Sequence, residues 1–186
     1  MHVDHPIISA DSHITEARNT YTDYIDPAYR DTAPHVESTE NFGDVYVIDG
    51  MRKTIPMGLI AAAGKPAEEL SKRVRYEELH RSGYDSDFRL ADQRVDGVSA
   101  EMIYPSVGMI LCNHPDRDYQ HACFDAYNEW ITEFCSYTRC RRAFARMTTR
   151  ANVMNGTAAA QKITSAMKKS RKVVRTTAAG SPSAYP

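Results

Sequence analysis

The acidic residues of this chain all lie in its first 133 positions, although the chain is 186 residues long. Residues 1–133 contain 12 Lys and Arg against 24 Asp and Glu, whereas residues 134–186 contain 11 Lys and Arg and no acidic residue. The formal net charge of −1 therefore combines a part of charge −12 with a part of charge +11. Because a folded surface normally carries both signs, this break predicts a body over 1–138 and a divergent basic segment over 139–186, poorly ordered or partly α/β.

Composition assigns the body to the ordinary globular class. With 42% hydrophobic and 25% charged residues, the chain has enough apolar material for one core. It contains no apolar run near the roughly 18 residues that span a bilayer and no signal-peptide pattern, so we expect a soluble cytoplasmic protein without membrane association. Its four cysteines form no C-x-x-C pair and are expected to be reduced core thiols rather than zinc ligands or a disulfide framework.

The first half of the chain contains a hairpin signal and two helical segments. An Asp-Gly pair at 49–50 separates two strand-like runs, 45–48 and 51–55, and such a pair between strands is a strong hairpin signal. One short helix is predicted over 18–26. A second, polar helix is predicted over 66–80, because a proline stands at its start and two glutamates follow.

The second half has a clearer alternation of elements. A helix is predicted over 87–96, ended by Gly97 as a left-handed cap, and a strand over 98–105. Apolar residues at three- and four-residue spacing predict a long helix over 117–137, with Asp116 as its N-cap. The basic segment gives weaker patterns for three elements: a strand over 143–147, a helix over 157–170 and a strand over 173–179. The alternation of strands and helices predicts an α/β fold.

A carboxylate and an imidazole follow the first apolar run of the chain. Residues 6–10 predict a short buried strand, and Asp11 and His13 come directly after it. Residues i and i+2 of a strand point to the same side, so this pair is able to share a divalent cation. Such a cation would lower the pKa of bound water towards roughly 7 or polarise a substrate oxygen. A D-x-H triplet also occurs by chance, so a structural or capping role stays open on these residues alone.

Four stretches of the body carry a resemblance to a known family. They are ISADSHITE at 8–16, DGVSAEMIYP at 96–105, HACFDAYNEW at 121–130 and EFC at 133–135. In order and spacing, they resemble the N-terminal part of the amidohydrolase superfamily, in the amidohydrolase-2 branch that includes aminocarboxymuconate-semialdehyde decarboxylase and related aromatic-acid decarboxylases. The fold of that family is a distorted (β/α)8 barrel with a divalent metal, usually zinc, at the C-terminal ends of its strands.

The resemblance implies roles for particular residues. Asp11 and His13 would be the metal pair of the first strand, and the metal would be zinc or, alternatively, manganese. The loop at 104–106 would lie on the rim of the pocket, where barrel active sites are built. Glu16 stands where this branch often has Glu-Pro, but Ala17 replaces the proline, which leaves the role of Glu16 in doubt. No catalytic residue is assigned.

The resemblance covers the first part of such an enzyme. The family completes its metal site with a later histidine and an aspartate from the last strand, and both would lie beyond residue 186. A full barrel needs roughly 250 residues, so we expect a truncated α/β protein: a partial TIM-like (β/α)8 barrel, first strands and helices only, with the hairpin as an insertion. The implied activity is metal-dependent hydrolysis or non-oxidative decarboxylation of a small carboxylic acid, and the chain itself is expected to be an inactive or incomplete fragment.

The basic segment has two interpretations. Its 11 cations would bind polyanions without sequence preference, as a non-enzymatic interaction module does. No recognised nucleic-acid-binding module accompanies them, so we favour a damaged or divergent continuation of the barrel over a nucleic-acid arm. The open edge of a partial barrel further predicts either homo-oligomers or aggregation.

The histidines outside the first strand give weaker signals. His114, just before the long helix, is expected to cap a helix or pack a loop, although it would lie near the pocket. His121 is expected at a packing interface, and the rest at the surface.

Overall fold

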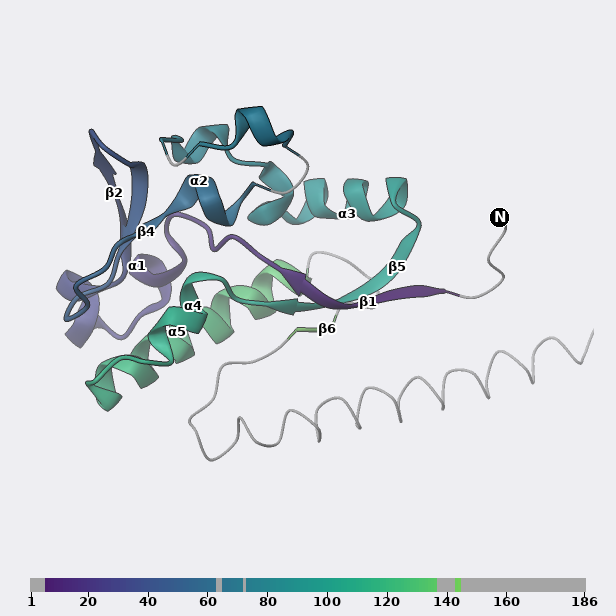
Figure 1. Ribbon diagram of the computed structural model, residues 1–186. Coiled ribbons are helices and arrows are strands. Elements are labelled where there is room, and N and C mark those ends of the chain that lie inside the picture. The colour runs from purple at the N-terminus through teal and green to yellow at the C-terminus, as the bar shows by residue number, and fades with distance from the viewer. Residues whose placement is uncertain (1–5, 63–64, 72, 137–142, 145–186) are drawn as a thin grey trace, which may run out of the picture. The chain divides into compact units, whose positions relative to one another are not determined.

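The computed structural model describes residues 6–62, 65–71, 73–136 and 143–144. Its first sheet has the order β1-β5-β6, with β1 at Ile7–His13, β5 at Val98–Tyr104 and β6 at Ala143–Phe144 (Figure 1). Both pairs of neighbouring strands are parallel. Ile7 pairs with Val98 and His13 with Tyr104, so the C-terminal ends of β1 and β5 lie side by side. All three strands were predicted, the third at 143–147.

Helices connect these parallel strands, as the sequence predicts. Helix α3 (Ser86–Val95) leads into β5, and the long helix α5 (Arg117–Ser136) follows it; Figure 1 shows them above and below the β1–β5 pair. The Asp85 carboxylate caps α3 by accepting from the backbone N–H of Asp87 and Phe88. The α/β class is therefore confirmed, whereas closure into part of a barrel stays a prediction.

Both predicted signals at the ends of these helices are confirmed. Gly97 has a φ of +69°, the left-handed conformation that ends a helix at lowest cost when the residue is glycine. Asp116 caps α5, because its carboxylate accepts hydrogen bonds from the N–H of Asp118 at 2.9 Å and of Tyr119 at 3.1 Å.

The second sheet is antiparallel and contains the predicted hairpin only in part. Its order is β2-β3-β4, with β2 at His35–Thr39, β3 at Gly43–Val47 and β4 at Ile55–Pro56. β3 and β4 do pair, but only at Val45–Pro56 and Tyr46–Ile55. The main partner of β3 is β2, for which the sequence predicts no strand.

A contact with the turn explains why the predicted hairpin is loose. The carbonyl of Asp49 accepts a hydrogen bond from His114 Nε2 at 2.8 Å. Gly50 has a φ of +71°, and a Cβ there would meet His114 Nε2 at 3.0 Å. The Asp-Gly turn is therefore formed, but it packs against the His114 ring and accepts its hydrogen bond instead of linking two strands tightly.

The predicted helix over 66–80 is wrong. The segment forms two short 3-10 turns, η2 (Ala67–Glu69) and η3 (Tyr76–Glu78). Tertiary contacts take the backbone groups that a helix needs: Val74 O accepts from Asp44 N at 2.9 Å, and Tyr76 N donates to the Asp44 carboxylate at 2.9 Å. The acidic side chain at position 44 thus outweighs the local helical signal.

The expectation that the first strand is buried is also wrong: every residue of β1 is exposed or half-buried, and Ile7 and Ile8 are each 44% exposed. Within the described residues β1 is an edge strand with β5 as its neighbour, so its apolar side chains lack the second neighbour that would cover them.

The core is formed by residues that follow β1, beginning with Ile14. It unites α1 (Thr20–Tyr24, within the predicted 18–26), α5, β3 and α2 (Met57–Ile60). Tyr21 and Tyr46 meet edge to face with ring centroids 6.0 Å apart. The largest fully buried side chains include Tyr21, Tyr46, Tyr127, Ile14, Ile48, Met57, Ile103, Leu111 and Ile131.

Three shorter elements complete the described fold: η1 (Pro27–Thr32), η4 (Arg81–Gly83) and α4 (Val107–Leu111). No helix in the described part of the chain is long and apolar enough to cross a membrane. The elements predicted over 157–170 and 173–179, and nearly all of the basic segment 139–186, lie outside the described residues.

Candidate metal centre

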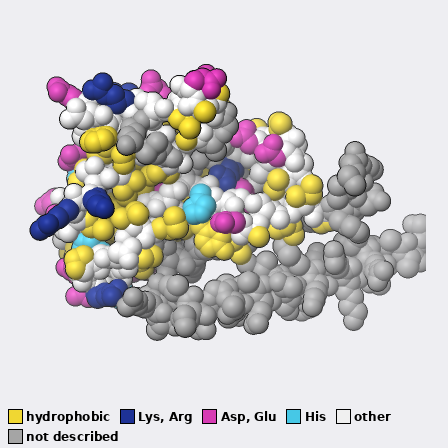
Figure 2. Space-filling view, in the orientation of Figure 1, with side chains coloured by type: hydrophobic (Ala, Val, Ile, Leu, Met, Phe, Trp, Pro, Cys, Tyr) yellow, Lys and Arg dark blue, Asp and Glu magenta, His cyan; other side chains and the backbone are white. Residues whose placement is uncertain are grey.

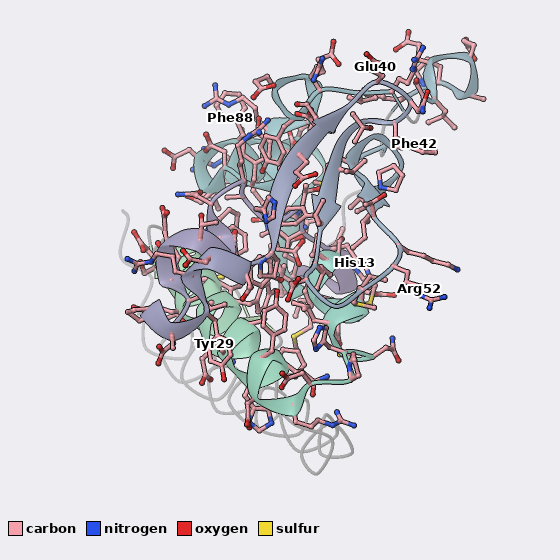
Figure 3. All side chains as sticks on the ribbon, turned by 90° about the vertical axis from the view of Figure 1, so that its left-hand side faces the viewer. His13, Tyr29, Glu40, Phe42, Arg52 and Phe88 are labelled. Carbon is pink, nitrogen blue, oxygen red and sulfur yellow. The ribbon has the colours of Figure 1, made fainter. Side chains whose placement is uncertain are left out.

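Asp11 and His13 lie together at the C-terminal end of β1. His13 Nε2 is 3.5 Å from Asp11 Oδ1, and their side chains are 44% and 81% exposed, respectively. His13 is labelled in Figure 3. On the face shown in Figure 2, a histidine and an acidic side chain lie side by side among hydrophobic side chains. The i, i+2 spacing thus brings the two predicted ligands to one side of the strand, within reach of solvent.

The other ring nitrogen of His13 faces a backbone carbonyl. Nδ1 lies 3.3 Å from Pro105 O, directly after β5, and the ring centroid lies 6.0 Å from that of Tyr104. When Nδ1 carries the proton and donates it to Pro105, Nε2 keeps its lone pair on the side of Asp11. Metal-binding histidines usually hold their second nitrogen in this way. The loop at 104–106, predicted as the rim of the pocket, thus contacts the candidate ligand.

A buried ion pair between α3 and β5 also contacts the C-terminal end of β1. Arg89 on α3 binds the Glu101 carboxylate on β5 with two hydrogen bonds, of 2.6 and 2.8 Å, and Gln93 also donates to this carboxylate. A third nitrogen of Arg89 donates to the carbonyl of His13 at 2.9 Å. Burial raises the pKa of Glu101, but the bonds from Arg89 outweigh it and hold this pKa below its usual value.

This ion pair was missed from the sequence. Arg89 and Glu101 are 12 positions apart on different elements, and no motif joins them. An arginine on a predicted helix directly before a strand that carries a glutamate was the available signal, and it is a weak one.

Glu16, whose role the sequence left in doubt, is completely buried. Its carboxylate accepts hydrogen bonds from three consecutive backbone N–H groups: Ser106 at 3.1 Å, Val107 at 3.1 Å and Gly108 at 2.9 Å. Removal from water outweighs these bonds and raises the pKa of Glu16 to about 7. A carboxylate in the interior, next to the candidate metal strand, is the main site feature that sequence reasoning did not predict.

The described histidines outside β1 and the described cysteines form no metal-binding group with Asp11 and His13. His114 is buried; its Nε2 donates to Asp49 O, and its Nδ1 accepts from Asp116 N at 3.2 Å. The packing role predicted for it is confirmed, whereas His121 is exposed rather than at an interface. Among the described cysteines, Cys123 is buried, as predicted for a core thiol, whereas Cys112 is exposed.

The donors in the described ranges are fewer than a complete metal centre needs. Among these residues, no group of three or more His, Cys, Asp and Glu side chains is arranged to hold a metal ion. Catalytic zinc sites usually have three protein ligands and an open fourth position. Asp11 and His13 fit two of these ligand positions.

Comparison with known proteins supports the fold. No protein-family model matches the sequence, and no curated protein matches it. The structure is similar to the crystal structure of an amidohydrolase from Mycobacterium avium subsp. paratuberculosis K-10, with a TM-score of 0.56 and 18% sequence identity. The similarity covers 90% of this chain and 48% of that chain, so this chain spans about half the length of the amidohydrolase. The two proteins share an α/β fold with a parallel sheet.

Proposed function

We propose that this chain contains part of the metal site of a metal-dependent hydrolase of the amidohydrolase superfamily, with Asp11 and His13 as two ligands of a divalent cation. The observation that carries the proposal is the arrangement of His13: Nδ1 faces the carbonyl of Pro105 at 3.3 Å, while Nε2 faces Asp11 at 3.5 Å. The pair lies at the C-terminal end of a parallel strand, the end at which barrel enzymes build their sites.

The donor set favours zinc, with manganese as the alternative. Zinc accepts imidazole nitrogen and carboxylate oxygen at about 2.0–2.2 Å, and it supplies either a hydroxide at neutral pH or polarisation of a substrate oxygen. The chain's own residues do the positioning: Pro105 orients the His13 ring, and Arg89 fixes the His13 backbone through its carbonyl.

The substrate class follows from the sequence resemblance. In that branch, a small carboxylic acid is hydrolysed or loses its carboxylate without oxidation. Tyr104, at the end of β5 beside His13, would then contact substrate on the rim. The remaining metal ligands and the loops that select a substrate would come from outside the described residues, so the part described here is an incomplete site that binds metal more weakly than a whole enzyme.

Metal titration of matched variants tests the proposal. Isothermal titration of the full chain with Zn2+ and with Mn2+ is expected to show one site, lost in Asp11→Ala and in His13→Ala. The matched control is His80→Ala, because His80 and Asp92 form another exposed histidine–carboxylate pair, at 2.7 Å. Equal loss in the control, or unchanged binding in the Asp11 and His13 variants, would exclude the pair as the site.

The charge of residues 134–186 supports a second candidate function. This segment carries 11 cations and no acid, which favours non-specific binding of a polyanion. It predicts salt-sensitive binding of any DNA or RNA by the full chain, lost when residues 139–186 are deleted. Absence of binding at low salt would remove this candidate.

A further inference from the structure

The buried carboxylate of Glu16 binds the backbone of residues 106–108, which directly follow β5. Oε1 accepts from Ser106 N and Gly108 N, and Oε2 accepts from Val107 N, all within 3.1 Å. Three consecutive N–H groups converge on one carboxylate that is 0% exposed. Glu16 therefore fixes the backbone at the beginning of α4, directly after the end of β5.

This clamp holds the peptide unit whose carbonyl faces His13, because Ser106 N and Pro105 O belong to the same planar peptide bond. Ser106 follows Pro105, whose oxygen lies 3.3 Å from His13 Nδ1. On the other side of this oxygen, Ile14 N donates to Tyr104 O at 3.0 Å. The Pro105 carbonyl is thus held between a strand contact before it and the Glu16 clamp after it, so its direction depends on both.

Glu16 is itself fixed through its own main chain. The hydroxyl of Tyr76 donates to Glu16 O at 2.9 Å, and that of Tyr46 donates to Ala17 O at 2.8 Å. Thr15 N donates to Gly83 O at 2.9 Å. Three hydrogen bonds thus fix the backbone at residues 15–17, and the Glu16 side chain extends from a well-anchored segment.

We infer that Glu16 is a positioning residue for His13: by clamping residues 106–108, it aims the Pro105 carbonyl at Nδ1 and so keeps Nε2 free on the side of Asp11. This inference rests on the proposed metal site for its functional meaning. Its physical content, the orientation of the His13 ring, does not depend on metal.

The test compares Glu16→Gln with wild type in the full chain, first without metal. Glutamine keeps the volume but replaces one acceptor oxygen with an NH2 group, which cannot accept from backbone N–H. The expected results are faster hydrogen exchange at the amides of 106–108 and a smaller Nδ1-protonated fraction of His13, read from its 15N ring shifts at pH 8. Zn2+ affinity is expected to fall about 10- to 100-fold, the usual cost of losing a support behind a metal ligand.

Two further variants separate positioning from general damage. His114→Gln removes another buried side chain that binds backbone groups, at Asp49 and Asp116, and it should leave the His13 ring shifts and Zn2+ affinity unchanged. Glu16→Asp keeps the charge on a shorter arm and should give an intermediate effect; it replaces Glu16→Gln if that variant does not fold.

The outcomes distinguish this inference from the proposed function. Unchanged His13 shifts and amide exchange in the Glu16 variants, or an equal effect of His114→Gln, would overturn the inference. If wild type binds no Zn2+ while the Glu16 variants still shift the His13 tautomer, the metal site is wrong and the positioning role stands.

Discussion

His13 Nε2 lies 3.5 Å from Asp11 Oδ1 on a part of β1 where both side chains reach solvent. A histidine–carboxylate contact with this exposure contributes little to the stability of a fold, because solvent screens it. The fold therefore does not depend on these two side chains for stability, which leaves them available for binding. The Arg89–Glu101 pair is different, because it is buried.

The first prediction separates binding from stability at this pair. Asp11→Ala and His13→Ala are expected to change the free energy of unfolding by less than about 1 kcal/mol, because exposed pairs contribute about that much or less. Urea unfolding followed by circular dichroism measures it. A cost of several kcal/mol in either variant would mean that the pair is structural.

The second prediction concerns the buried ion pair. Arg89→Ala is expected to cost about 3–5 kcal/mol, because it leaves the Glu101 carboxylate buried without its partner. The double variant Arg89→Met with Glu101→Leu, which removes both charges, should recover most of that loss. Urea unfolding of the single and double variants gives both values, and a double variant no more stable than Arg89→Ala would contradict this account.

The third prediction is a pH dependence caused by Glu16. Burial raises its pKa from 4.5 to about 7 in the folded chain, so between these values the folded state holds a proton that the unfolded state has released. Stability from this group is therefore highest below pH 4.5 and falls by about 3 kcal/mol as the pH rises to 7.

Comparison with Glu16→Gln isolates this effect from other titrating groups. Glutamine does not titrate, so the difference in unfolding free energy between wild type and variant should slope across pH 4.5–7 and level off above it. Denaturant unfolding at pH steps measures this difference. Parallel profiles for the two proteins would show that Glu16 titrates normally.

The fourth prediction uses two glycines with the same backbone conformation. Gly43 and Gly97 have φ values of +67° and +69°, but a Cβ at Gly43 would lie 2.5 Å from Val74 N, whereas one at Gly97 would meet nothing within 4 Å. Gly97→Ala should cost only the conformational penalty of about 1–2 kcal/mol. Gly43→Ala should cost clearly more, and thermal melts of the two variants that coincide would refute the close approach.

The sequence predicted the elements whose signals are local. The caps at Asp116 and Gly97 and the periodicity of the long helix depend on neighbouring residues, and α3, β5 and α5 lie where expected. The helix predicted over 66–80 does not form, because the carboxylate of Asp44, more than 20 positions earlier, accepts the hydrogen bond from the backbone N–H of Tyr76.

In the candidate site, too, the sequence predicts what depends on neighbouring residues and not what depends on contacts between distant elements. Asp11 and His13 were found because a strand brings i and i+2 to one side. The supports around them, Glu16 and the Arg89–Glu101 pair, depend on contacts between distant elements, and side-chain chemistry at a single position does not reveal such contacts. The sequence pattern therefore predicts the two candidate ligands but not the residues that support them.

Anomalous diffraction at the zinc edge, from crystals of the full chain grown with Zn2+, tests the central claim most directly. The account predicts a single strong peak about 2.0–2.2 Å from both His13 Nε2 and an oxygen of Asp11, absent from crystals of His13→Ala. A map with no peak between these two side chains, or with zinc bound elsewhere in the chain, would contradict it.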